Sequence, residues 1–196
     1  MSTTQPIKDR TALEAVKNYY LLHDYNPRNY LLIILGINTA YRISDILRLT
    51  WGNVYDFERK MFRSHIHLTE QKTGKESFVF INEALKTALK KYADYLNMET
   101  LCASSILFVS RKSNNRPISR TQAFRIVKEA ADYAGLEESH ISCHSLRKTF
   151  GYFAWKQGTP PALLMNIYRH SSYEITKKYL CIGQDEQDEV YNTISL

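Results

Sequence analysis

One β-rich interruption in an otherwise helical chain limits the folds that this sequence can adopt. Three segments within it are rich in β-branched and aromatic side chains, which is typical of strands. They lie at residues 54–57, 61–69 and 77–81. Lys72-Thr73-Gly74-Lys75 separates the second segment from the third, and glycine in such a stretch permits a tight hairpin turn. We therefore expect a small three-stranded antiparallel sheet, with lysines projecting from the tip of a hairpin.

Helical periodicity dominates the rest of the chain. Apolar residues recur three and four positions apart, which is the spacing of a helix with one buried face. The expected helices cover residues 13–21, 27–39, 42–49, 82–97, 119–135, 145–157 and 159–168. A further helix is opened by a capping box at Ser171 and carries Tyr179 two turns later. Helices and strands together predict a mainly α fold with a small antiparallel sheet inserted near its start.

Length and composition favour a single domain, residues 1–196, in a reducing compartment. The chain is long enough to bury a core, and no repeat or linker divides it. Its longest apolar run, residues 31–35, is far shorter than a bilayer span. The cysteines, Cys102, Cys143 and Cys181, are too widely spaced for a disulfide framework or a zinc site. We expect a cytoplasmic protein with no membrane segment and no bound metal.

The charge of the chain is basic and unevenly distributed. The net charge is +6, but residues 184–196 contain four acidic and no basic side chains. Without that stretch, residues 1–183 carry a net charge of +10. An excess of this size favours a polyanionic partner, with nucleic acid as the first candidate. A solvated basic surface without such a partner is the alternative that charge alone leaves open.

Six residues in four short motifs are the candidates for catalysis. They are Arg42, Lys72, His144, Arg147, His170 and Tyr179. Each has an ordinary interpretation when taken singly. Arg42 can form a surface ion pair with Asp45, His144 and Arg147 share a helix face as many surface pairs do, and a lysine at a hairpin tip is usually solvated. The order and spacing of the whole set therefore carry the inference.

All four motifs resemble those of one family, the phage integrases and Xer-type tyrosine recombinases. Thr-Ala-Tyr-Arg-Ile-Ser-Asp-Ile-Leu-Arg-Leu-Thr-Trp at residues 39–51 resembles the first arginine motif of that family. Residues 72–75 resemble its β-hairpin lysine motif, and residues 144–150 resemble its His-x-x-Arg box. Residues 170–179 resemble its terminal motif, in which a tyrosine follows a histidine by nine positions. The resemblance extends over about residues 27–182 and implies the catalytic fold of the tyrosine recombinases.

The resemblance implies that the chain breaks a DNA phosphodiester through a covalent intermediate. Tyr179 would attack the phosphorus and form a 3′-phosphotyrosyl link. Arg42 and Arg147 would clamp the non-bridging oxygens bidentately, which a lysine does poorly. Lys72 would protonate the departing 5′ oxygen. The phosphotyrosyl link keeps the phosphodiester energy, so we expect no ATP, no metal and no other cofactor.

The two histidines are expected to act at the same phosphate. His144 would assist proton transfer at the tyrosine or orient the phosphate, since imidazole titrates near neutral pH. His170 would donate a hydrogen bond to a non-bridging oxygen. The partner that the resemblance implies is double-stranded DNA, on which we expect a homotetramer, with a monomer free in solution as a further state.

Three features depart from the pattern of the family. Many members have glycine directly before the second histidine, where this chain has Arg169, and this leaves the aim of His170 open. Lys75 competes with Lys72 for the role of acid, and Lys72 is favoured because it precedes the Thr-Gly turn. The segment before Pro27 is too short for the N-terminal core-binding domain of most integrases. We expect either an excised catalytic domain or a short form similar to the fimbrial phase-variation invertases.

The acidic tail, residues 183–196, can form a terminal helix. Val190, Tyr191 and Ile194 would give it an apolar stripe. In the family such tails often dock on a neighbouring protomer, and packing on the same domain is the alternative.

The resemblance favours an active site-specific recombinase that acts in DNA integration, excision or inversion. Two other functions stay open. One is a non-catalytic DNA-binding relic of the same fold, and the other is a type IB topoisomerase, which uses the same tyrosine chemistry.

Overall fold

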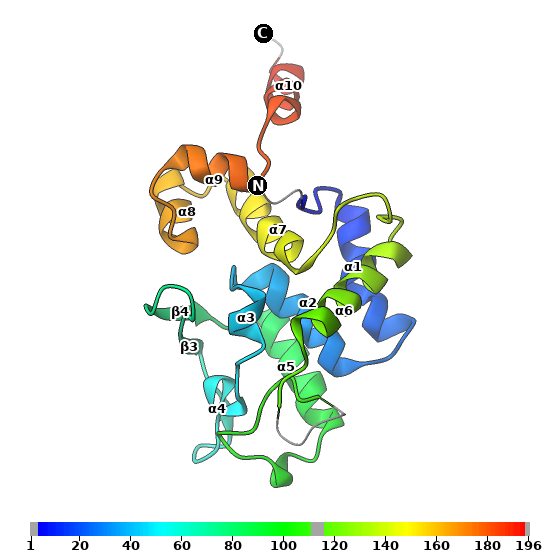
Figure 1. The fold of residues 1–196 in the computed structure, drawn as a ribbon, viewed down its shortest axis with the longest axis vertical. Coiled ribbons are helices and arrows are strands. Elements are labelled where there is room, and N and C mark those ends of the chain that lie inside the picture. Colours follow the sequence, from blue (N-terminus) through cyan, green and yellow to red (C-terminus); the bar gives the residue numbers. More distant parts are fainter. Residues whose placement is uncertain (1–3, 111–115, 195–196) are drawn as a thin grey trace.

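The structure is a computed structural model that describes residues 4–110 and 116–194, and it is mainly helical (Figure 1). The longer helices are α1 (Arg10–Leu22), α2 (Pro27–Asn38), α5 (Glu83–Tyr95), α6 (Arg120–Tyr133), α7 (Cys143–Lys156), α8 (Pro161–Tyr168) and α10 (Gln184–Thr193). The shorter ones are α3 (Ile43–Ile46), α4 (Trp51–Val54), a 3₁₀ helix (Met98–Thr100) and α9 (Tyr173–Tyr179). The mainly α class expected from the periodicity is confirmed.

Side-chain caps fix where several helices begin. Asn26, Asn82 and Ser119 each accept a hydrogen bond from a backbone N–H in the first turn of α2, α5 and α6, which satisfies a donor that the helix leaves unpaired. The cap of α9 differs from the expectation by one residue, because Ser172 accepts from Ile175 N at 3.3 Å. Its last residue is the tyrosine of the terminal motif.

The expectation of one three-stranded sheet is wrong, because the described strands form two separate antiparallel pairs. The strands are β1 (Tyr55–Asp56) with β2 (Met61–Phe62), and β3 (His65–Thr69) with β4 (Glu76–Phe80). The segment expected as one strand at 61–69 changes partner in its middle. Arg63 N donates to Val54 O, on the side of the first pair. Ser64 O accepts from Ile81 N, so the chain pairs with the third segment from there on.

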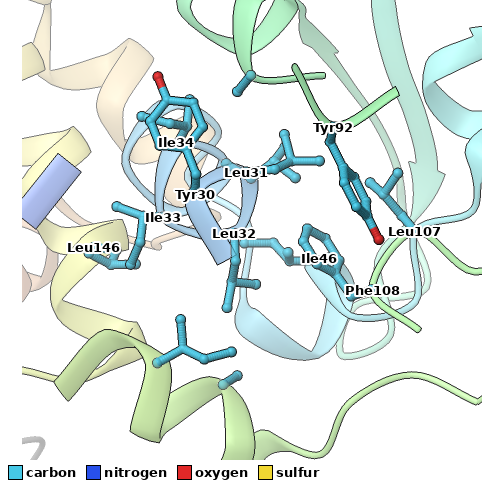
Figure 2. Packing of buried hydrophobic residues seen from close by; sticks show 14 of the residues in the cluster. Tyr30, Leu31, Leu32, Ile33, Ile34, Ile46, Tyr92, Leu107, Phe108 and Leu146 are labelled. Atoms are coloured by element: carbon cyan, nitrogen blue, oxygen red, sulfur yellow. The ribbon is translucent and has the colours of Figure 1, made fainter. Parts of the chain in front are cut away.

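Helix α2 lies at the centre of the hydrophobic core (Figure 2). Its residues 31–35 are each at most 1% exposed. A helix that is apolar on all sides needs neighbours on all sides, and α1, α5 and α7 pack against it. Gly36 permits the close approach of α7, because a Cβ there would lie 2.6 Å from Cδ1 of Leu146. The core thereby fixes the position of the helix that carries the His-x-x-Arg box.

A second, smaller apolar cluster joins α7, α8 and α9. It consists of Ala40, Tyr168, Leu180 and Ile182. Gly151 of α7 makes room for it, because a Cβ at this position would lie 2.4 Å from the Tyr168 hydroxyl oxygen. That hydroxyl donates to Arg147 O at 2.7 Å. Tyr179 packs against the cluster, so the position of the tyrosine is set by apolar packing as well as by its own helix.

The C-terminal helix α10 extends away from the rest of the molecule (Figure 1). Two ion pairs attach the first part of α10 to the rest of the same chain. Glu186 pairs with Lys8, and Glu189 pairs with Lys156 at 2.8 Å. Its apolar residues face solvent: Val190 is 54% exposed and Tyr191 is 78% exposed. The expected terminal helix is therefore present, with its acidic side held in cis and its apolar side uncovered.

Candidate active site

Arg42 stands directly before α3 and points its side chain at the β3–β4 hairpin. The chain turns before it at Ala40, whose φ is 55°. The Arg42 side chain is only 20% exposed, and its Nη1 donates to Oε2 of Glu70 at 2.8 Å. The first arginine of the set is thus partly buried and already held by a carboxylate.

Lys72 lies in the loop between β3 and β4 and is exposed. Two backbone hydrogen bonds close this loop, from Glu70 N to Lys75 O and from Gly74 N to Glu70 O. Gly74 has a φ of 66°, which glycine adopts without strain. Asp45 Oδ1 also accepts from Gln71 N at 2.8 Å, so α3 holds the backbone next to the lysine.

An open hollow of about 540 Å³ brings three of the expected residues together. Arg42, Lys72 and His144 line it, together with Gln71 and the start of α7. Lys75 is not among its lining residues, which agrees with the preference for Lys72 as the acid.

His144 and Arg147 lie one turn apart at the start of α7. Ser142 caps this helix, and its Oγ accepts from His144 N at 3.2 Å. The His144 side chain is exposed, whereas Arg147 is only 6% exposed. Partial burial of its ring, and then the positive charges of Arg147, Lys148, Arg42 and Lys72, lower the pKa of His144. A lowered pKa favours the neutral imidazole, which is the form that can accept a proton.

His170 is aimed by the turn between α8 and α9. Its Nδ1 lies 3.0 Å from Oγ1 of Thr176, a fully buried residue of α9. The rings of His170 and Tyr179 meet edge to face at 5.2 Å between centroids. Burial and the charges of Arg147 and Arg42 lower the pKa of His170.

Tyr179 is partly buried among cations. Burial raises the pKa of its hydroxyl, and the positive charges of Arg147 and Arg42 oppose that rise. Lys148, which is 2% exposed, places its Nζ 5.2 Å from the centroid of the Tyr179 ring. A phenolate formed here is stabilised by these fixed positive charges, which water alone would not supply.

The structure therefore gathers the six expected residues on one side of the fold, from the start of α3, the hairpin loop, α7, the α8–α9 turn and the end of α9. Sequence reasoning missed the residues that hold them. These are Asp45, Glu70, Lys148, Tyr168 and Thr176. The ordinary interpretation of Arg42 taken singly pairs it with Asp45 at the surface, but Asp45 is 3% exposed and its Oδ1 accepts from the hairpin backbone instead. The signal for these residues is the burial of polar side chains, which needs the fold.

Within residues 4–110 and 116–194, no three His, Cys, Asp or Glu side chains cluster in a way that could hold a metal ion. In the same part of the chain, every helix is too short or too polar to cross a bilayer.

Known proteins match this chain over nearly its whole length. The model of the Phage integrase family matches residues 4–184. The probable integrase/recombinase YoeC of Bacillus subtilis (strain 168) is 40% identical over 191 residues, which make up 97% of either chain. The tyrosine recombinase XerD of Chlorobaculum tepidum is 29% identical over 79% of this chain and 49% of XerD. The type 1 fimbriae regulatory protein FimE of Escherichia coli (strain K12) is 25% identical over 78% of this chain and 73% of FimE.

Solved structures share the fold. The crystal structure of the XerA recombinase superposes with a TM-score of 0.75 at 19% identity, over 97% of this chain and 65% of XerA. The XerH recombinase in a pre-cleavage complex with its difH substrate gives a TM-score of 0.70 at 18% identity, over 96% of this chain and 53% of XerH. The chain thus spans about half to two thirds of these larger recombinases.

Fold, motif order and relatives define a class of DNA strand transferases, the tyrosine recombinases. The chain belongs to the phage integrase family. The recognition made from the four motifs is confirmed, including the similarity to fimbrial regulators such as FimE.

Proposed function

We propose that this chain cleaves and rejoins double-stranded DNA at specific sites, with Tyr179 as the nucleophile. The observation that carries the proposal is the surrounding of Tyr179. Its ring lies against His170, and the charges of Arg147 and Arg42 act on its hydroxyl. The proposal places the scissile phosphate between these two arginines, next to the phenol oxygen.

The proposed cleavage step forms one bond and breaks one. The Tyr179 oxygen attacks phosphorus, the bond between phosphorus and the 5′ oxygen breaks, and Lys72 gives that oxygen a proton. The phenol proton leaves to a base, for which His144 is the candidate because its lowered pKa favours the neutral form. Arg42 and Arg147 neutralise the charge that develops on the non-bridging oxygens. The reverse attack by a 5′ hydroxyl from another strand rejoins the DNA and exchanges partners.

The proposed partners follow from charge and from the tail. The net charge of +10 on residues 1–183 suits a DNA backbone. We propose a homotetramer on DNA, in which the exposed apolar side of α10 contacts a second copy. Residues 1–196 then act as one catalytic domain, and the proposed site of action is the cytoplasm.

A nicked suicide substrate tests the nucleophile. The duplexes are built from inverted repeats beside the gene, with a nick just past the cleavage site. After cleavage the short fragment with the free 5′ hydroxyl diffuses away, so the reaction cannot reverse and the covalent adduct accumulates. We expect an adduct with the native chain and none with Tyr179→Phe. Tyr173→Phe, on the same helix, is the matched control and should retain the adduct. An undiminished adduct in Tyr179→Phe refutes the assignment.

Two further outcomes separate the alternatives. DNA binding with a steep salt dependence, without an adduct on any such duplex, would indicate a non-catalytic relic. Relaxation of supercoiled plasmid without sequence preference would indicate a topoisomerase.

A further inference from the structure

A buried carboxylate connects the catalytic hairpin to two arginines. Glu70 follows β3 and is 7% exposed. Its Oε2 accepts from Arg42 at 2.8 Å and from the Thr73 hydroxyl at 3.2 Å. Its Oε1 lies 3.5 Å from Nε of Arg169. Arg169 comes from the distant α8–α9 turn, so Glu70 is the point where three parts of the site meet.

Arg169 contacts both ends of the loop that joins β3 to β4. Its Nε faces Glu70 at the end of β3, and its Nη2 donates to Glu76 O at the start of β4 at 3.0 Å. Lys72 lies in the loop between these two attachment points. Figure 1 shows the hairpin below α8, the helix that Arg169 directly follows. One side chain therefore bridges the hairpin and the turn that carries His170.

The backbone of Arg169 is strained in a way that calls for compensation. Its φ is 59° and its ψ is 40°, the left-handed region that side chains with a Cβ rarely adopt. A strained residue persists where its surroundings over-determine it. The two contacts of the guanidinium with the hairpin are the compensation that the structure offers.

We propose that Arg169 and Glu70 form a clasp that positions Lys72 for its role as acid in strand cleavage. This inference rests on the proposed function. Lys72 is exposed at the tip of a two-stranded hairpin, and such a hairpin is only marginally ordered by itself. The clasp fixes the two ends of the hairpin loop against the residue that follows α8, so that Lys72 reaches the departing 5′ oxygen from one direction. Arg169 is a positioning residue and touches neither the phosphate nor the leaving group.

The variant Arg169→Gly isolates this role. Glycine adopts a positive φ without strain, so the turn that aims His170 keeps its conformation while the clasp is lost. The matched control is Lys60→Gly in the turn between β1 and β2. Lys60 is exposed and also has a positive φ, of 53°. This control removes one positive charge and relieves the same kind of backbone strain away from the site.

Amide hydrogen exchange of the free protein tests whether the clasp orders the hairpin. In Arg169→Gly we expect the amides of Glu70 and Gly74, which close the loop, to exchange about tenfold faster. In Lys60→Gly they should exchange as in the native chain. Unchanged exchange in Arg169→Gly overturns the proposal without any reference to DNA.

Cleavage of two matched substrates tests the catalytic consequence. One has the ordinary bridging 5′ oxygen, and the other has sulfur there, which leaves as a thiolate and needs no proton. For Arg169→Gly we expect the adduct to form about tenfold more slowly on the oxygen substrate and within about twofold of the native rate on the sulfur substrate. An equal loss on both substrates, or no loss on either, overturns the proposal. If the native chain forms no adduct with either substrate, the proposed function fails, and the proposed effect of the clasp on cleavage fails with it. Amide hydrogen exchange of the free protein still decides whether the clasp orders the hairpin.

Discussion

The two halves of the active site are built in opposite ways. Helices α7, α8 and α9 form a packed wall in which Arg147 is 6% exposed and Tyr168 is fully buried. The β3–β4 hairpin on the other side is a two-stranded pair whose tip, with Lys72, is exposed. The proposed nucleophile and one of the proposed phosphate-binding arginines thus lie in the packed half, whereas the proposed acid lies on the least buried part of the site. Arg169 bridges the two halves through its contacts with Glu70 and Glu76.

The largest expected effect tests the wall. In Arg147→Lys the charge remains but the planar fork is lost, and an ammonium offers no rigid, parallel pair of N–H donors to two phosphate oxygens. We expect the rate of adduct formation to fall on the order of 10³-fold. Single-turnover kinetics on the nicked substrate measure it, with the exposed Arg59→Lys as control. A loss of less than about threefold would show that the guanidinium geometry does not matter there.

The hairpin gives the next largest effect. Lys72→Ala removes the expected acid, and we expect a loss of about 10²-fold on the oxygen substrate with near-native rates on the sulfur substrate. Lys75→Ala should stay within about twofold on both, because Lys75 does not line the hollow shared by Arg42 and His144. A reversed pattern would assign the acid to Lys75. Neither change should alter stability by more than about 0.5 kcal/mol, since both side chains are exposed.

The same contrast explains what could be predicted from the sequence. The helices of the wall have strong local signals, such as apolar periodicity and the capping box expected at Ser171, so their positions were predicted within a few residues. The hairpin region was less predictable, because a bend at Ser64 decides which segments pair, and β propensity does not report it. The six motif residues were found because they lie in linear motifs. Glu70 was not, since its partners Arg42 and Arg169 are distant in sequence and meet only in the fold.

A matched pair of glycine substitutions compares the stability of the two halves. In Gly151→Ala the new Cβ would meet the Tyr168 hydroxyl at 2.4 Å and Leu180 Cδ2 at 2.5 Å, and such overpacking costs about 2 kcal/mol. In Gly74→Ala nothing lies within 4 Å, and the cost is that of a φ of 66°, about 1 kcal/mol. Urea denaturation should rank Gly151→Ala as the less stable variant. The opposite order would show that the wall has room to adjust.

The pH dependence gives the smallest and most specific effect. The pKa values of His144 and His170 are both lowered, by burial and by neighbouring cations, so the folded protein favours their neutral forms. In the unfolded chain each titrates near its usual pKa of about 6.5. The unfolded state therefore binds more protons just below that pH, and stability that is full above it is lost as the pH falls through it.

Thermal unfolding across pH 5 to 8 measures this dependence, and His144→Gln should flatten it. The rate of adduct formation should fall on acidification with a midpoint below about pH 6.5, because a neutral His144 is needed to accept a proton. His144→Gln removes that limb, whereas Lys72→Ala leaves it in place. A midpoint above about 6.5 would contradict the direction of the His144 shift. An unchanged acid limb in His144→Gln would move the role of base to another group of the wall.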